Sequence, residues 1–213
     1  NERGYGMHYL NTIQRTWVLS RLTIEMDEMP IAYERFRVDT WVDAVVRFFT
    51  SRNFRISKDN RVIGYGKSIL AMIDTATRQP VDILNIRDGL ISQYVDVLTP
   101  CPIEKGSRVK ISGDAKCVRS IATTYSDVDM NGHINSVKYI EHVLDLWSLD
   151  WYKQYRIKRF DIAYVAESHC GDVLNFYLEE EKEYTYAVRI TKSNELMTKE
   201  IEVVRCKLVF VKN

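Results

Sequence analysis

Chemically active side chains are concentrated in the segment 125–139. Asp127 and Asp129 are carboxylates, Asn131 is an amide and His133 is an imidazole, with Gly132 among them. A carboxylate can take a proton from water, an imidazole can transfer one, and an amide can orient a carbonyl oxygen or a water molecule. The functional site is therefore expected in this segment.

A strand and a helix are expected to position these side chains. Residues 117–124 are rich in β-branched side chains, which favour a strand. After the turn, apolar side chains recur at helical spacing: Val137, Ile140, Val143, Leu144 and Trp147. Asn135 is the expected N-cap of this helix. The first N–H groups of a helix lack intrahelical partners, so they would attract a ligand oxygen that gains negative charge.

The same segment has two other interpretations. Asp127, Asp129 and Asn131 match early positions of a calcium-binding EF-hand loop. The twelfth position of that loop needs a bidentate carboxylate but is Lys138 here, and a strand precedes the turn where an EF-hand has a helix. Calcium is therefore disfavoured. Asp and Asn also cluster simply because they cap helices and tolerate tight turns, and this structural alternative stays open.

The composition is that of a globular protein. Among 213 residues, 46% are hydrophobic, and 30 basic side chains nearly balance 29 acidic ones. This balance shows no bulk footprint for nucleic acid. No apolar run approaches the roughly 20 residues that span a bilayer, and no leader sequence opens the chain. The four cysteines lack C-x-x-C spacing, which favours the reducing cytoplasm, and neither a metal nor a cofactor is expected.

Short alternating segments on either side of this region predict antiparallel strands. In the first half they are residues 17–19, 22–24, 36–38, 45–49, 54–56 and 69–73, and in the second half residues 157–167, 172–178, 184–191 and 201–211. Residues 1–11 are expected to end a helix whose upstream part is missing, and residues 87–105 to form a linker with one short helix.

The two halves repeat. Residues 21–26 align with residues 159–164 at an offset of about 138, and the register continues into the next strand. The repeat predicts an α+β fold in which a long helix lies across an antiparallel sheet twice. Domains are expected at 1–95 and 96–213. In this register Glu167 aligns with Met29, so the first half has no second copy of the acid.

The segment 126–140 resembles the signature D-x-N-x-H-[VI]-N-x-x-K-Y of acyl-acyl-carrier-protein (acyl-ACP) thioesterases. Residues 17–25, 75–81 and 164–172 are similar to family segments in the same order. The resemblance implies a tandem (double) hot-dog fold, with acyl-chain binding in the first domain and catalysis in the second. It also implies hydrolysis of long- or medium-chain acyl-ACP to free fatty acid. The implied partner is acyl carrier protein with its phosphopantetheine-linked acyl chain. The protein itself is expected to be a cytoplasmic monomer or homodimer.

The resemblance assigns catalytic roles to four residues. Asp129, Asn131 and His133 match the motif, and Glu167 matches an acidic residue on a strand that faces the turn. Either carboxylate could be the base that activates water, with Glu167 slightly favoured. Asn131 would orient the water or the thioester, and His133 would hold the acidic network or protonate the departing thiol.

Ser168 departs from the plant members of the family, which carry a cysteine there. This difference argues against a thiol nucleophile. A dyad of Ser168 with His169 is disfavoured because adjacent strand residues point to opposite faces. Two other functions stay open: a hot-dog thioesterase that acts on acyl-CoA, and a non-catalytic acyl-binding module.

Overall fold

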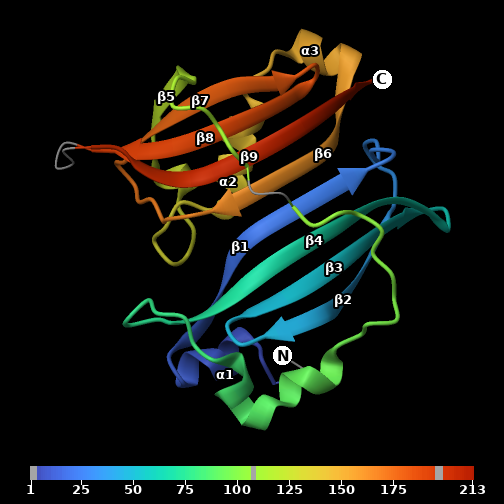
Figure 1. Cartoon of the computed structure of the whole chain (residues 1–213), viewed down its shortest axis with the longest axis vertical. Helices are drawn as coiled ribbons and strands as arrows, with labels where there is room; N and C mark the ends of the chain where they lie inside the picture. The colour runs from blue at the N-terminus through green and yellow to red at the C-terminus, as the bar shows by residue number, and fades with distance from the viewer. Residues whose placement is uncertain (1–3, 107–108, 195–198) are drawn as a thin grey trace. The chain divides into compact units, whose positions relative to one another are not determined.

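The computed structural model describes residues 4–106, 109–194 and 199–213, so the first three residues of the expected helical segment 1–11 lie outside it (Figure 1). The chain divides into an N-terminal unit, Asn1–Lys105, and a C-terminal unit, Gly106–Asn213. The boundary lies later than 95/96 because the intervening segment packs on the N-terminal unit. Val95 forms a β-bridge with Val42, and Trp41 Nε1 donates a hydrogen bond of 3.1 Å to the Thr99 carbonyl.

The N-terminal unit contains four antiparallel strands in the order β2-β3-β4-β1. They are β1 (Arg15–Met26), β2 (Arg37–Val46), β3 (Phe49–Lys58) and β4 (Arg61–Asp74). Asp59 and Asn60 join β3 to β4 with φ of 49° and 62°, the left-handed pair that a tight hairpin requires. The strand expected at 45–49 is wrong, because Arg47 and Phe48 form the turn between β2 and β3.

Two short helical segments accompany this sheet. Helix α1 (Met7–Thr12) supplies Leu10, and the 3-10 segment η1 (Ile83–Tyr94), which is kinked at Ile86–Gly89, supplies Ile83 and Ile91. These side chains pack with Met72 of β4 in one buried cluster. The described part of this unit therefore has two short helical segments where the repeat predicted a long helix. The short helix expected within 87–105 begins earlier, at Ile83.

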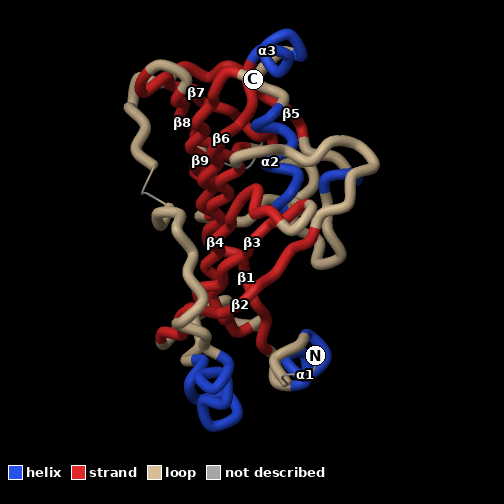
Figure 2. The backbone as a smooth tube through the Cα atoms, turned by 90° about the vertical axis from the view of Figure 1, so that its right-hand side faces the viewer, coloured by secondary structure: helices blue, strands red, loops and turns tan. Residues whose placement is uncertain are grey.

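The C-terminal unit contains five antiparallel strands in the order β6-β9-β8-β7-β5. They are β5 (Lys116–Ala122), β6 (Tyr155–Tyr164), β7 (Val173–Lys182), β8 (Thr185–Ser193) and β9 (Ile201–Lys212). A 3-10 turn η2 (Tyr125–Asp127), helix α2 (Ser136–Leu144) and helix α3 (Leu149–Gln154) connect β5 to β6. Figure 2 shows α2 beside one face of the strands. Tyr139 and Val143 of α2 are buried, as is Phe176 of β7, so the apolar face of the helix contributes to the core of this unit.

The last four strands of the C-terminal unit follow the connection scheme of the N-terminal unit, which confirms the sequence repeat. Strands β2, β3 and β4 form consecutive hairpins and β1 pairs with β4; likewise β7, β8 and β9 form consecutive hairpins and β6 pairs with β9, while β5 adds to the edge beside β7. The pairing of β1 shifts register between Leu19 and Arg21, and that of β6 shifts between Ile157 and Arg159, the repeat-equivalent positions. The predicted α+β class with antiparallel sheets is confirmed. None of the helices in the described ranges is long and apolar enough to cross a membrane.

Candidate active site

The motif forms a compact turn between β5 and α2. Asp129 N–H donates to the His133 carbonyl at 2.8 Å, and Gly132, with φ of 82°, donates to the Asp129 carbonyl at 3.1 Å. The Asn135 side chain accepts from Val137 N–H at 2.9 Å, so the predicted N-cap is confirmed. A strand ending at Ala122 and a capped helix therefore fix the two ends of the motif.

The Asp129 carboxylate lies inside this turn and stabilises it. It accepts from the backbone N–H of Asn131 at 2.7 Å and from that of His133 at 3.3 Å. The Asn131 side-chain amide donates to its other oxygen at 3.3 Å. Asp129 thus holds three donors of its own turn, a role typical of Asp in tight turns.

Glu167 meets the motif at His133. Its Oε2 lies 3.4 Å from His133 Nε2, with 38% of the Glu167 side chain and 27% of the His133 side chain exposed. The ring of His169 packs edge-on against that of His133, with centroids 5.2 Å apart. The contact is therefore accessible to solvent.

Glu167 lies in a loop, so its placement on a strand was wrong. The pairing of β6 with β9 ends at Tyr164, and the N–H groups of Val165 and Ala166 then both donate to the Val203 carbonyl. The chain leaves the ladder at this point and crosses to the motif, where Ser168 accepts from the Ile134 N–H at 2.9 Å. We call residues 165–171 the acidic loop. Its backbone bond to Ile134 fixes Glu167 beside the turn.

These contacts bring the four predicted site residues together in the C-terminal unit. Asp129 and Asn131 are joined directly, and His133 contacts both Asp129, through its backbone, and Glu167, through its ring. Lys192 Nζ donates to the Glu167 main-chain carbonyl at 2.7 Å, which further fixes the acidic loop.

The N–H groups expected to bind a substrate oxygen are largely used by the protein. Asn135 accepts from Val137 through its side chain and from Lys138 through its carbonyl, both at 2.9 Å. The amides of residues 131–135 also bond to acceptors in the turn, in residue 127 or in the acidic loop. A turn this tight satisfies its own donors, so two side chains are better placed to donate to a ligand oxygen: the Asn131 amide and the His133 ring.

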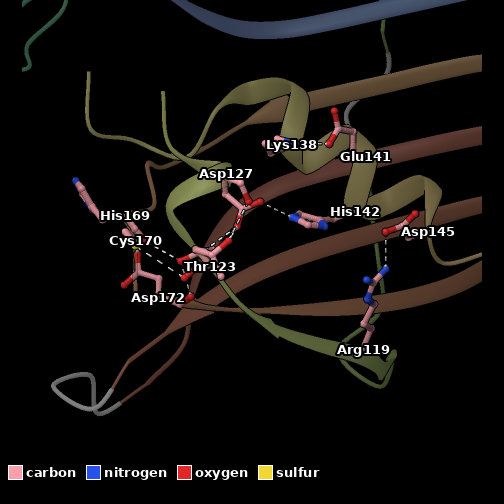
Figure 3. A network of polar contacts seen from close by, with 12 residues as sticks. Arg119, Thr123, Asp127, Lys138, Glu141, His142, Asp145, His169, Cys170 and Asp172 are labelled. Carbon is pink, nitrogen blue, oxygen red and sulfur yellow. Dashed lines mark hydrogen bonds and ion pairs between the residues drawn. The ribbon is translucent and has the colours of Figure 1, made fainter. Parts of the chain in front are cut away.

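One polar pair of this site was not predicted (Figure 3). Asp127 is 6% exposed and accepts from the backbone of Thr124 at 2.8 Å, from its hydroxyl at 3.0 Å and from His142 Nε2 at 3.1 Å. Burial raises the pKa of Asp127, but these hydrogen bonds outweigh burial and hold the pKa below its ordinary value. Two sequence features could have indicated the pair: the capping box formed by Thr124 and Asp127, and a histidine on the apolar face of α2 between Tyr139 and Val143.

Within the described residues, no group of three or more His, Cys, Asp or Glu side chains is arranged to hold a metal ion.

Comparisons with known proteins find the same family for both units. Residues 1–91 match the family model of the acyl-ACP thioesterase N-terminal domain, and residues 112–207 match that of the C-terminal domain. The crystal structure of an acyl-ACP thioesterase from Bacteroides thetaiotaomicron is 45% identical, covers 99% of this chain and 82% of its own, and superimposes with a TM-score of 0.88.

Plant proteins are more distant relatives. The 12:0-ACP thioesterase from Umbellularia californica shares the fold at 17% identity, with a TM-score of 0.81 over 99% of this chain and 82% of its own. A chloroplastic palmitoyl-acyl carrier protein thioesterase from Gossypium hirsutum is 24% identical over 160 residues, which are 73% of this chain and 38% of that protein. This chain therefore spans less than half the length of that relative.

Proposed function

This chain belongs to the acyl-ACP thioesterase family, and on that premise we propose that it hydrolyses the thioester of long- or medium-chain acyl-ACP to free fatty acid and acyl carrier protein. The observation that carries the proposal is the contact of Glu167 with His133 beside the turn of Asp129 and Asn131. It supplies a base, a donor for the carbonyl oxygen and a group for proton transfer in one place.

The reaction uses water as the nucleophile. Glu167 takes a proton from a water molecule, and the water oxygen forms a bond to the thioester carbon. One N–H of the Asn131 amide points to Asp129, so its second N–H is available to the carbonyl oxygen as negative charge develops. The intermediate then collapses, the carbon–sulfur bond breaks, and the thiolate receives a proton through His133 to leave as the carrier thiol.

Glu167 is a better base than Asp129 on geometric grounds. Three donors of its own turn engage the Asp129 carboxylate, so its oxygens already serve the turn and are less available to a water molecule. The Glu167 side chain is more exposed than the His133 side chain that it contacts, so water reaches it. We therefore assign Glu167 as the base and Asp129 as the residue that shapes the turn and orients Asn131.

Acyl-chain binding by the N-terminal unit is a second part of the proposal. Met29 stands at the repeat position of Glu167, so this unit offers an apolar side chain where the other offers the acid. Shortening it in Met29→Ala should change the ratio of kcat/KM between chain lengths, because one methylene in a pocket contributes about 1–3 kcal/mol. A uniform change for every length would assign chain selection to the C-terminal unit.

We propose further that the protein works in the cytoplasm as a monomer or homodimer. The cysteines that the structure describes are unpaired, as is usual for a reducing compartment.

The test is thiol release from a panel of acyl-ACP thioesters of different chain lengths, with the matching acyl-CoA thioesters in parallel. We expect higher kcat/KM for acyl-ACP and loss of release in Glu167→Gln. Preference for acyl-CoA would make the protein an acyl-CoA thioesterase, and binding without release would make it an acyl-binding module.

A further inference from the structure

Asp127 holds the two ends of the turn that carries the site residues. Its main-chain carbonyl accepts from the Asn135 N–H at 2.8 Å, which closes residues 127–135 into a loop. We call this stretch the motif loop. The Asp127 carboxylate accepts hydrogen bonds from Thr124, which lies just beyond the end of β5. The position of Asp127 therefore sets where the loop lies between β5 and α2.

His142 connects this anchor to the core. It lies near the end of α2, its Nε2 is 3.1 Å from Asp127 Oδ1, and its side chain is 18% exposed against 8% for Asp127. Its ring also packs edge-on against Phe176 of β7, with centroids 6.3 Å apart. The pKa of Asp127 is held low, so its carboxylate accepts only, and Nε2 is the donor.

A second ion pair joins the same helix to β5 but differs in its surroundings (Figure 3). Asp145 Oδ2 lies 3.3 Å from Arg119 Nη1, and their side chains are 61% and 32% exposed. Water competes for the charges of such an exposed pair, so the pair contributes little to stability. Thr124 donates to Asp127 Oδ2, and His142 donates to Oδ1. A buried carboxylate oxygen that loses its donor must find another or move toward solvent. Loss of the His142 donor would therefore displace Asp127, whereas loss of Asp145 would displace nothing in the motif loop.

We propose that His142 is a positioning residue for the thioester hydrolysis proposed above: through Asp127 it fixes the motif loop that presents Asp129, Asn131 and His133 to the substrate. The expected effect of His142 on kcat rests on the proposed function. The expected effect of His142 on the motif loop rests on the structure alone. His142 does not touch the reacting atoms. Its contribution is to kcat, since a displaced loop lowers the fraction of bound substrate that meets aligned groups.

The test compares three variants with the wild type. His142→Phe keeps an aromatic ring over Phe176 and removes the donor. His142→Gln places an amide N–H near the position of Nε2 and restores it. Asp145→Asn is the matched control, because it removes the charge from the exposed ion pair between the end of α2 and β5 and leaves Asp127 untouched. If circular dichroism shows that His142→Phe is unfolded, His142→Met takes its place as the variant without a donor.

Kinetics give the first readout. We expect kcat to fall roughly ten- to hundredfold in His142→Phe with KM within about twofold, and to return to within about threefold of the wild type in His142→Gln. Asp145→Asn should match the wild type. Unchanged kcat in folded His142→Phe, or an equal loss in His142→Gln, would overturn the proposal.

Amide hydrogen exchange gives a readout that needs no substrate. We expect the Asn135 and His133 amides to exchange faster in His142→Phe and at the wild-type rate in His142→Gln and Asp145→Asn. Equal exchange in all three variants would overturn the positioning role. An inactive wild type that shows the expected exchange pattern would instead reject the thioesterase function and retain the role of His142 in fixing the loop.

Discussion

Nε2 of His133 lies 3.4 Å from Oε2 of Glu167, and this contact joins the motif loop to the acidic loop after β6. Neither loop carries the whole set of groups that hydrolysis needs. The motif loop supplies the amide and the imidazole, and the acidic loop supplies the carboxylate that can accept a proton from water. The proposed hydrolysis therefore depends on how these two loops are held together.

Glu167→Gln should abolish most turnover and leave the fold intact. The amide keeps the size of the side chain but cannot accept a proton, and removal of a positioned base costs roughly 10²- to 10⁴-fold in rate. Steady-state thiol release measures the loss. Glu141→Gln is the control, because Glu141 pairs with Lys138 on the surface of α2. Turnover of Glu167→Gln at the level of this control would remove Glu167 from the mechanism.

Asp129→Ala should lower both turnover and stability. Two backbone N–H groups and the Asn131 side chain would lose their acceptor, and loss of such a turn or cap acceptor costs about 0.5–2 kcal/mol. Thermal unfolding beside the kinetic assay separates the two effects, and Glu167→Ala is the comparison because its carboxylate is the proposed base. If Asp129→Ala melted at the wild-type temperature but lost turnover as Glu167→Ala does, Asp129 would be a direct participant in the chemistry.

Features set by neighbouring residues could be predicted from the sequence. The Asn135 cap and the hairpin at Asp59 and Asn60 depend on short stretches of chain whose side chains and backbone determine the geometry. The repeat of the two halves could also be predicted from the sequence. The matched register shifts at Leu19 and Ile157 show that the repeat extends to local backbone irregularities.

Features set by distant partners could not be predicted. The position of Glu167 depends on where β9 stops pairing with β6, which no property of residues 165–167 reveals. Helical spacing placed Val137 on the apolar face of α2, yet it is 53% exposed, while Tyr139 is 3% exposed. Only the orientation of the helix on the sheet decides this, and the same orientation brings His142 to Asp127.

Ser168→Ala should keep turnover within about tenfold of the wild type, because loss of a true nucleophile costs several orders of magnitude. Ser168 is fully buried beside Tyr139, and neither hydroxyl forms a hydrogen bond of normal geometry within the part of the chain that is described. A serine with no base in contact is a poor nucleophile. This geometry replaces the argument from strand alternation, which does not apply because Ser168 lies in a loop.

The measurement for Ser168 joins kinetics to mass spectrometry. Wild-type protein quenched during turnover should carry no acyl group and should release thiol without a burst, and Ser168→Ala should still release thiol. Cys170→Ser is a control for the exposed thiol of the same loop. An acyl adduct on Ser168 together with an inactive Ser168→Ala would establish a covalent intermediate and overturn the role of Glu167 as the base for water.

Asp127→Asn should destabilise the protein at neutral pH and progressively less in acid. Burial raises the pKa of Asp127, but hydrogen bonds from Thr124 and His142 outweigh it, so the folded-state pKa lies below the ordinary value of 3.8. The stabilisation is therefore complete above the unfolded-state pKa and is lost as the pH falls through the lower folded-state pKa. Urea unfolding of the wild type and Asp127→Asn between about pH 7 and pH 3 measures this stabilisation, and the difference in unfolding free energy should shrink below about pH 4.

Asp145→Asn is the control. It removes an exposed carboxylate from the end of α2 and tests whether any lost charge has this effect. A difference for Asp127→Asn that stayed constant down to pH 3 would show that its partners do not favour the charged form, and the anchor of the motif loop would then have to be explained by the Asp127 main-chain bond to Asn135 alone.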